Sequence, residues 1–263
     1  MTEWNQADPL PPFLVTSVPK SGTHLMHQIL TGMPGIRHEI ANSEAKFFID
    51  HHTTNMELFK DHMYRLGQIK PNQFGLGHVF YSETYAGMID RLRLKHIFVY
   101  RDPRDVLVSL AYFIPSKWNE HPLFDMFRNE ITDTKGRMLV LLEGVGERWH
   151  DYDAWNRPFY HWIRDRNTLP VSFEELMSSE QSRRAALLSV VRYLWDGLQP
   201  PAPHSRLVEL MEANIAPSES RTFRSGRIGS WRDEFDEEVT RKFKEIAGGL
   251  LIDFGYEKNN DWT

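Results

Sequence analysis

The sequence predicts an α/β fold, with a mostly parallel central sheet flanked by helices in a single domain. Short apolar strands alternate with amphipathic helices up to about Ser182, and this alternation is typical of a parallel sheet that helices cover on both faces. Two of the strands lead through short turns directly into helices. The length of 263 residues suits one α/β domain, so we expect a single domain over residues 1–263.

The first expected strand covers residues 12–18 (PFLVTSV) and is stopped by Pro19. A helix is expected over 23–31, up to Gly32, because apolar residues recur there at helical spacing: Leu25, Met26, Ile29 and Leu30. Ligands of parallel α/β sheets bind at the carboxyl ends of the strands. The turn at 19–23 is therefore the first candidate site.

The second expected strand covers residues 95–100 (KHIFVY). The helix after it begins with Asp102 as N-cap and Pro103 at the first helical position, which makes the turn at 101–105 the second candidate site. A third strand is expected over 168–173, leading into a helix at 174–177. Beyond about Ser182 the pattern is mainly helical.

The composition limits the classes of protein that fit. A hydrophobic content of 41% supports a sizeable core, and no apolar run approaches the ~20 residues that span a bilayer. Residues 1–12 carry no basic region of a signal peptide, and the chain has no cysteine for a disulfide or a thiolate nucleophile. These observations predict a cytoplasmic protein without a membrane partner.

The net charge of −5 predicts repulsion from nucleic acids, so we expect no nucleic-acid partner. A polyanionic ligand would have to be bound by a local cluster of basic groups.

Residues 18–24 (VPKSGTH) carry the chemistry of a phosphate-binding turn. Gly22 lets a ligand approach the backbone, and the first N–H groups of the following helix can donate to an anion. Lys20 adds a mobile positive charge, and Ser21 and Thr23 add hydroxyl donors. The arrangement is P-loop-like, although the lysine precedes the glycine and the Walker spacing is absent. The alternative is a plain strand–turn–helix with an exposed lysine.

Two segments resemble those of one known family. Residues 19–23 (PKSGT) resemble the 5′-phosphosulfate loop of soluble, cytosolic-type sulfotransferases, which use 3′-phosphoadenosine 5′-phosphosulfate (PAPS) as donor. Residues 98–109 (FVYRDPRDVLVS) resemble the 3′-phosphate segment of the same family. Two matches in the order of the family favour the family over a chance agreement.

The resemblance implies a set of donor-binding residues. The 5′ end of PAPS would be held by Lys20, Ser21, Gly22 and Thr23, and His24 would also contact the donor. Arg101 and Ser109 would hold the 3′-phosphate, and Phe173 aligns with a tyrosine that helps to hold the adenine. A tryptophan that commonly stacks on the adenine is replaced by Leu25. The alternative for the second segment is a charged helix start, whose four charged residues pair with one another on the surface: Arg101, Asp102, Arg104 and Asp105.

A late loop is rich in arginine and contains no acid, with Arg221, Arg224, Arg227 and Arg232 inside twelve residues. Residues 224–232 (RSGRIGSWR) resemble the family's Arg-Lys-Gly-x-x-Gly-Asp-Trp-Lys segment. The resemblance implies that Arg224, Ser225 and Gly226 contribute to the 3′-phosphate site. A solvated basic loop, or a patch for a protein partner, is the alternative.

Sulfuryl transfer to an alcohol needs a base near the attacking oxygen. Of the twelve histidines, His78 lies at nearly the separation from Arg101 that the family's catalytic histidine has. The resemblance therefore implies His78 as the base and Lys20 as the group that stabilises charge on the leaving oxygen. A packed histidine at a strand end is the alternative, and His51 and His52 are the other candidates for the base.

We therefore predict a sulfotransferase that moves the sulfuryl group of PAPS to a hydroxyl or amine of a small-molecule acceptor, with no metal. Aromatic residues in 39–80 and 114–157 suit a ring-containing acceptor, whereas the oligomeric state is open. A nucleotide or small-molecule kinase is one alternative, which would need a Walker loop and a magnesium-binding acid. A non-catalytic nucleotide-binding protein is the other.

Overall fold

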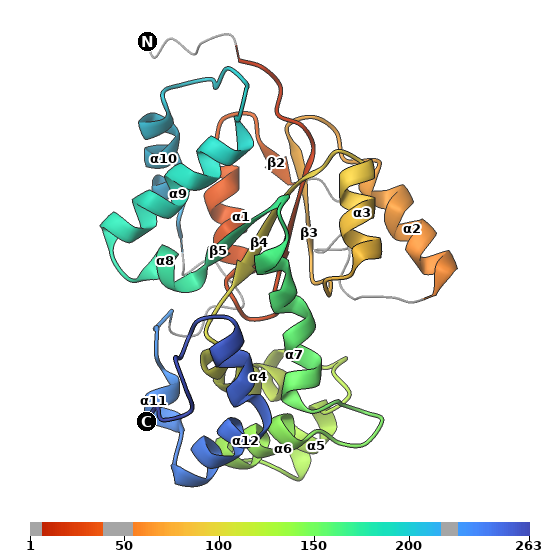
Figure 1. The fold of residues 1–263 in the computed structure, drawn as a ribbon, viewed down its shortest axis with the longest axis vertical. Coiled ribbons are helices and arrows are strands. Elements are labelled where there is room, and N and C mark those ends of the chain that lie inside the picture. The colour runs from red at the N-terminus through yellow and green to blue at the C-terminus, as the bar shows by residue number, and fades with distance from the viewer. Residues whose placement is uncertain (1–6, 39–54, 217–225) are drawn as a thin grey trace. The chain divides into compact units, whose positions relative to one another are not determined.

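The computed structural model describes residues 7–38, 55–216 and 226–263 (Figure 1). Its contacts divide the chain into two units. The first, here called the sheet unit, comprises Met1–Tyr100 and His161–Phe223, and the second, here called the helical unit, comprises Arg101–Tyr160 and Arg224–Thr263. The expectation of a single domain over 1–263 stays a prediction.

The sheet unit contains a five-stranded sheet in the order β2-β3-β1-β4-β5, and every pairing is parallel. The strands are β1 (Phe13–Ser17), β2 (Arg37–His38), β3 (Gln73–Gly77), β4 (Lys95–Tyr100) and β5 (Thr168–Ser172). The central strand β1 is buried along its whole length, as expected for a parallel sheet covered on both faces. The predicted mostly parallel α/β sheet is confirmed.

Helices flank this sheet on both faces (Figure 1). On one face lie α1 (Thr23–Thr31), α8 (Phe173–Met177), α9 (Glu180–Leu194) and α10 (His204–Ala213), and on the other lie α2 (Met56–Leu66) and α3 (Glu83–Arg91). Short polar residues start several of them: the side chain of Asn55 caps α2, Ser82 caps α3 and Ser179 caps α9. One 3₁₀ turn, η1 (His161–Arg164), precedes β5.

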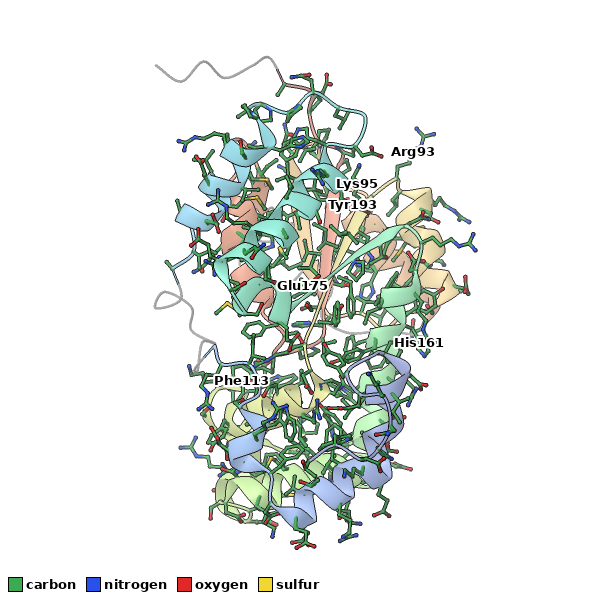
Figure 2. The ribbon with its side chains drawn as sticks, turned by 60° about the vertical axis from the view of Figure 1, so that its left-hand side comes forward. Arg93, Lys95, Phe113, His161, Glu175 and Tyr193 are labelled. Atoms are coloured by element: carbon green, nitrogen blue, oxygen red, sulfur yellow. The ribbon has the colours of Figure 1, made fainter. Side chains whose placement is uncertain are left out.

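The amino-terminal end of β4 is fixed to α9 by Tyr193. Its hydroxyl accepts a hydrogen bond from the His96 N–H at 2.9 Å, and Lys95 Nζ lies 5.1 Å from the centre of its ring (Figure 2). The His96 ring is itself buried between two threonines, with Nε2 2.8 Å from Thr16 Oγ1 and Nδ1 2.7 Å from Thr168 Oγ1. Burial lowers the pKa of His96 to about 3. His96 is therefore a neutral structural residue that joins β1, β4 and β5.

The helical unit consists of α4 (Pro103–Lys117), α5 (Phe124–Asn129), α6 (Thr134–Glu143), α7 (Tyr152–Tyr160), α11 (Trp231–Glu234) and α12 (Glu237–Asp253). Its core is formed by buried side chains of α4, α6 and α12, among them Leu107, Leu141 and Phe243. The hydroxyl of Tyr152 donates to the Pro103 carbonyl at 2.6 Å, which fixes α7 to the start of α4.

The observed boundaries agree closely with the expected ones. The helix at 23–31 and the strand at 95–100 have the predicted bounds, and the first strand is shorter at both ends. The third strand ends at Ser172 rather than at residue 173 because Ser172 and Glu175 form a capping box that begins α8 with Phe173.

Candidate functional site

The turn between β1 and α1 has an unusual backbone. Lys20 and Gly22 have φ angles of 72° and 103°, in the left-handed region. For Lys20 this conformation costs roughly 1–2 kcal/mol, which main-chain bonds offset. The Val18 N–H donates to the Val99 carbonyl at 3.1 Å, and the Ser21 N–H donates to the Val18 carbonyl at 3.2 Å. Because Gly22 has no side chain to cap α1, the first turn of this helix presents N–H groups suited to an anion.

Ser21 and Phe173 both line this turn. The Ser21 side chain is fully buried, and its Oγ finds no hydrogen-bond partner among the residues that the structure describes. An unsatisfied buried hydroxyl costs about 1–3 kcal/mol, so a ligand that bonds to it would gain stability. A Cβ at Gly22 would lie 3.0 Å from Phe173 Cδ2, so the phenyl ring packs against the turn. Phe173, the first residue of α8, thus lies beside the turn that is predicted to bind the 5′ end of PAPS.

His78 follows β3 directly and lies beside the same turn. The parallel pairing of β1 with β3 aligns Thr16 with Gly77, which brings the His78 ring to Ser17. Its Nδ1 is 2.8 Å from the Ser17 carbonyl oxygen and 3.2 Å from Ser17 Oγ. A carbonyl can only accept, so Nδ1 carries the proton and Nε2 holds the lone pair of the neutral ring. This is the tautomer that a base acting through Nε2 needs.

Ser17 also connects His78 to the turn between β1 and α1. Its Oγ lies 2.6 Å from Thr23 Oγ1. The main chain next to His78 is fixed as well, because Trp162 Nε1 donates to the Val79 carbonyl at 2.8 Å. Sequence reasoning did not single out Ser17. Its position at the carboxyl end of a strand, directly before the turn, was the signal that could have found it.

In the helical unit, Arg101 and Ser109 are both buried, with 6% and 7% of their surface exposed. Arg101 Nη2 donates to Asp105 Oδ2 at 3.2 Å and to the Arg227 carbonyl at 2.6 Å. Its own carbonyl accepts a hydrogen bond from the Tyr160 hydroxyl. The two acceptors at Nη2 therefore orient the guanidinium, and Tyr160 fixes the main chain of Arg101.

The neighbouring charged pair is equally buried. Asp102 Oδ1 accepts the Arg104 N–H at 2.9 Å, as predicted for an N-cap, and Asp102 Oδ2 lies 2.7 Å from Arg104 Nη2. Arg104 Nη1 also lies 2.6 Å from Glu257 Oε1. Burial raises the pKa of Asp102, against the opposing effect of the Arg104 bonds and charge. The four charged residues do pair with one another, as the alternative states, but the pairs are buried in the helical unit and do not lie on the surface.

Only part of the late arginine-rich loop is described. Arg221, Arg224 and Ser225 lie outside the described residues, as do His51 and His52. Gly226 has a φ of 63°, and Arg227 Nη2 lies 2.6 Å from Asp233 Oδ2 at the surface. At the position of the family's adenine-stacking tryptophan, Leu25 packs partly buried against the core of the sheet unit. His24, on the first turn of α1, is half-buried.

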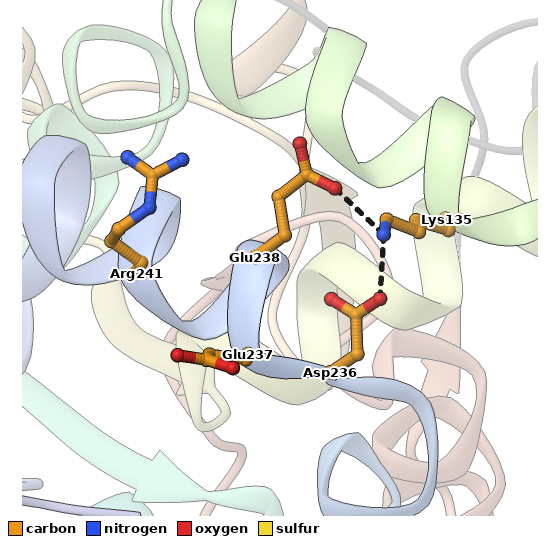
Figure 3. Close-up of a pocket in the computed structure, with 5 residues that line it drawn as sticks. All are labelled: Lys135, Asp236, Glu237, Glu238 and Arg241. Carbon is orange, nitrogen blue, oxygen red and sulfur yellow. Dashed lines mark ion pairs between the residues drawn. The ribbon is translucent and has the colours of Figure 1, made fainter.

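A surface pocket of the helical unit contains none of the predicted site residues (Figure 3). Its lining is Lys135, Asp236, Glu237, Glu238 and Arg241. Lys135 Nζ lies 2.7 Å from Asp236 Oδ2 and 2.6 Å from Glu238 Oε2, and hydrogen bonds to both carboxylates raise its pKa. Such exposed pairs contribute about 0–1 kcal/mol to stability, so we interpret the lining of this pocket as ordinary surface ion pairs.

Within 7–38, 55–216 and 226–263, no three histidine, aspartate or glutamate side chains are grouped so that they could hold a metal ion. Over the same residues, no helix has both the length and the apolar character to span a bilayer.

A parallel sheet with a turn suited to an anion after its central strand, and a histidine beside that turn, is typical of nucleotide-binding α/β proteins. The family model described as "Sulfotransferase domain" matches residues 10–183, more than half of the 263-residue chain. The chain belongs to the sulfotransferase family, and the predicted sulfuryl-transferase class is confirmed.

Solved structures share the fold at low sequence identity. A mouse sulfotransferase, SULT7A1, complexed with PAP superimposes with a TM-score of 0.61 at 17% identity, over 91% of this chain and 84% of the other. Retinol dehydratase in complex with androsterone and the inactive cofactor PAP gives a TM-score of 0.55 at 15% identity, over 96% and 84%. Retinol dehydratase with retinol and PAP gives 0.54 at 16% identity, with the same coverage.

Proposed function

We propose that this sulfotransferase transfers the sulfuryl group of PAPS to a hydroxyl or amine of a small-molecule acceptor in the cytoplasm, with His78 as the base. The observation that carries the proposal is the hydrogen bond between His78 Nδ1 and the Ser17 carbonyl at 2.8 Å. It leaves Nε2 as the proton acceptor, beside a turn suited to a phosphosulfate. Structures of the same fold complexed with PAP support PAPS as the donor.

The 5′ end of the donor would bind to the turn after β1. Lys20 supplies positive charge, Ser21 Oγ and the first N–H groups of α1 supply hydrogen bonds, and Gly22 and Thr23 complete the turn. His24 and Phe173 would contact the rest of the nucleotide. The support is the left-handed backbone of the turn, the unsatisfied Ser21 hydroxyl and the Phe173 ring that packs on Gly22.

The 3′-phosphate would be bound by Arg101, Ser109, Arg224, Ser225 and Gly226. The buried and oriented Arg101 guanidinium supports this assignment, because an arginine fork binds phosphate strongly and directionally.

The reaction is an in-line displacement at sulfur. His78 Nε2 accepts the proton of the acceptor while its oxygen or nitrogen forms a bond to sulfur. The bond between sulfur and the bridging oxygen of the 5′-phosphate breaks, and PAP leaves with the electron pair. Lys20 stabilises the charge that builds on the bridging oxygen, an interaction that is stronger in the transition state than in the ground state.

A turnover assay with ³⁵S-labelled PAPS and a panel of hydroxylated and aminated small molecules tests the proposal. We expect label to move to at least one acceptor, and turnover to survive EDTA because the described residues offer no metal cluster. Loss of turnover with EDTA, restored by magnesium, would favour phosphoryl-type chemistry. Tight PAP binding without transfer to any acceptor would favour a non-catalytic binding protein.

A further inference from the structure

Asp105 is a fully buried carboxylate on the first turn of α4, with 0% of its surface exposed. Besides Arg101 Nη2 at 3.2 Å, its oxygens accept hydrogen bonds from the Gly229 N–H at 2.8 Å, the Ser230 hydroxyl at 2.9 Å and the Trp231 N–H at 3.0 Å. A carboxylate has about four acceptor positions, so this set matches its capacity.

The position of Asp105 on the helix relates it to the 3′-phosphate residues. Asp105 and Ser109 lie four residues apart on α4 and therefore share one face of that helix, and Arg101, just before the helix begins, donates to Asp105. In the sequence, Asp105 therefore lies midway between Arg101 and Ser109, two of the residues that the proposed function assigns to the 3′-phosphate.

The same carboxylate organises the late loop. Arg101 Nη2 reaches the Arg227 carbonyl at 2.6 Å, so Arg101, Asp105 and the main chain of 227–231 form one closed network. The Trp231 ring is fixed separately, because the Arg104 guanidinium lies 4.1 Å from its centre.

We propose that Asp105 is a positioning residue for recognition of the 3′-phosphate: it orients the Arg101 guanidinium and holds the 226–231 turn against the start of α4. This inference rests on the proposed function. The charge of Asp105 alone would weaken phosphate binding. Its hydrogen bonds act in the opposite direction, because they fix the donor groups before the ligand arrives. We expect this preorganisation to outweigh the repulsion between the Asp105 carboxylate and the phosphate. Without the carboxylate, the N–H groups of Gly229 and Trp231 would lose a charged acceptor.

The test compares the affinities of PAP and AMP, because only PAP carries the 3′-phosphate. In the Asp105→Asn variant we expect PAP affinity to fall by about tenfold and AMP affinity by less than about twofold, since an amide cannot accept all of these bonds. The KM for PAPS should rise similarly, with kcat at saturation nearly unchanged. Equal losses for PAP and AMP, or tighter PAP binding, would overturn the role of Asp105.

Tyr152→Phe is the matched control. It removes a buried hydrogen bond to the start of α4, at the Pro103 carbonyl, without touching 226–231. It should lower the melting temperature while keeping the PAP-to-AMP affinity ratio. If Asp105→Asn does not fold, Ser230→Ala replaces it: loss of one bond to Asp105 should reduce the ratio by about two- to fivefold. An unchanged ratio in Ser230→Ala would then overturn the proposal.

The wild-type protein separates this inference from the proposed function. Equal affinities for PAP and AMP in the wild type would overturn the 3′-phosphate site itself. A clear wild-type preference for PAP that Asp105→Asn retains would overturn only the positioning role.

Discussion

The two strand-to-helix turns of this protein are stabilised by different forces. At 18–23, in the sheet unit, left-handed backbone angles and main-chain hydrogen bonds set the conformation. At 101–105, in the helical unit, buried ion pairs and carboxylate hydrogen bonds set it. The first turn should therefore be sensitive to changes in backbone freedom, and the second to changes in charge.

The largest effect should come from the base beside the first turn. Replacing His78 with alanine should lower the single-turnover rate by ~10²–10⁴-fold, because general base catalysis contributes about that factor. PAP affinity should hardly change, since His78 is assigned to the acceptor proton. Replacing His150, which is exposed in the helical unit, serves as the control and should leave the rate near normal. Near-normal turnover of His78→Ala would move the base elsewhere, with His51 and His52 next.

Removing a charge from the second turn should lower the free energy of unfolding more than removing one from an exposed ion pair. Arg104→Ala leaves the buried Asp102 carboxylate without its ion pair, which should cost about 3–5 kcal/mol of unfolding free energy. Arg206→Ala removes an exposed pair with Glu209 and should cost about 0–1 kcal/mol. Urea denaturation measures both variants. Similar small losses for both would show that buried charge does not stabilise the second turn.

Backbone substitution at the first turn should have a moderate effect. Gly22→Ala combines a left-handed φ of 103° with a Cβ only 3.0 Å from Phe173 Cδ2, so it should lose about 1–3 kcal/mol and weaken PAP binding. Gly35 also has a positive φ, of 77°, but nothing lies within 4 Å of its Cβ position. Gly35→Ala therefore measures the backbone strain alone. Equal melting temperatures for the two variants would contradict the contact with Phe173.

Acid should destabilise both units gradually. Burial lowers the pKa of His96 in the sheet unit to about 3 and of His121 in the helical unit to about 4. Because each folded pKa lies below the ordinary value of 6.5, the unfolded chain binds more protons once the pH falls below about 6.5. The stability from the neutral rings is complete above that pH and decreases toward pH 3–4. Melting temperatures measured from pH 7 to pH 5 should fall, and a flat profile would contradict these shifts.

The sequence predicted the elements whose pattern is local. The bounds at 23–31 and 95–100 were right because apolar spacing and capping residues act within each segment. The strand β3 was harder to recognise, since Gly75 and Gly77 are poor strand formers and burial beside β1 decides their conformation. For the site, PKSGT indicated the first turn directly. The link between Asp105 and the late loop had no local signal, because Gly229, Ser230 and Trp231 lie more than 120 residues further along the chain.

The discontinuous sheet unit also fixes the order in which a ribosome delivers its parts. β4 is complete at Tyr100, but its neighbour β5 ends only at Ser172, after the whole of 101–160 has been made. At a synthesis rate of about 5–20 residues per second, one edge of β4 stays unpaired for several seconds until β5 has been made. Unpaired strand edges are templates for association with other chains. A nascent chain that stalls before Ser172 therefore exposes the unpaired main-chain groups of β4, and the longer the stall lasts, the longer this edge can associate with other chains.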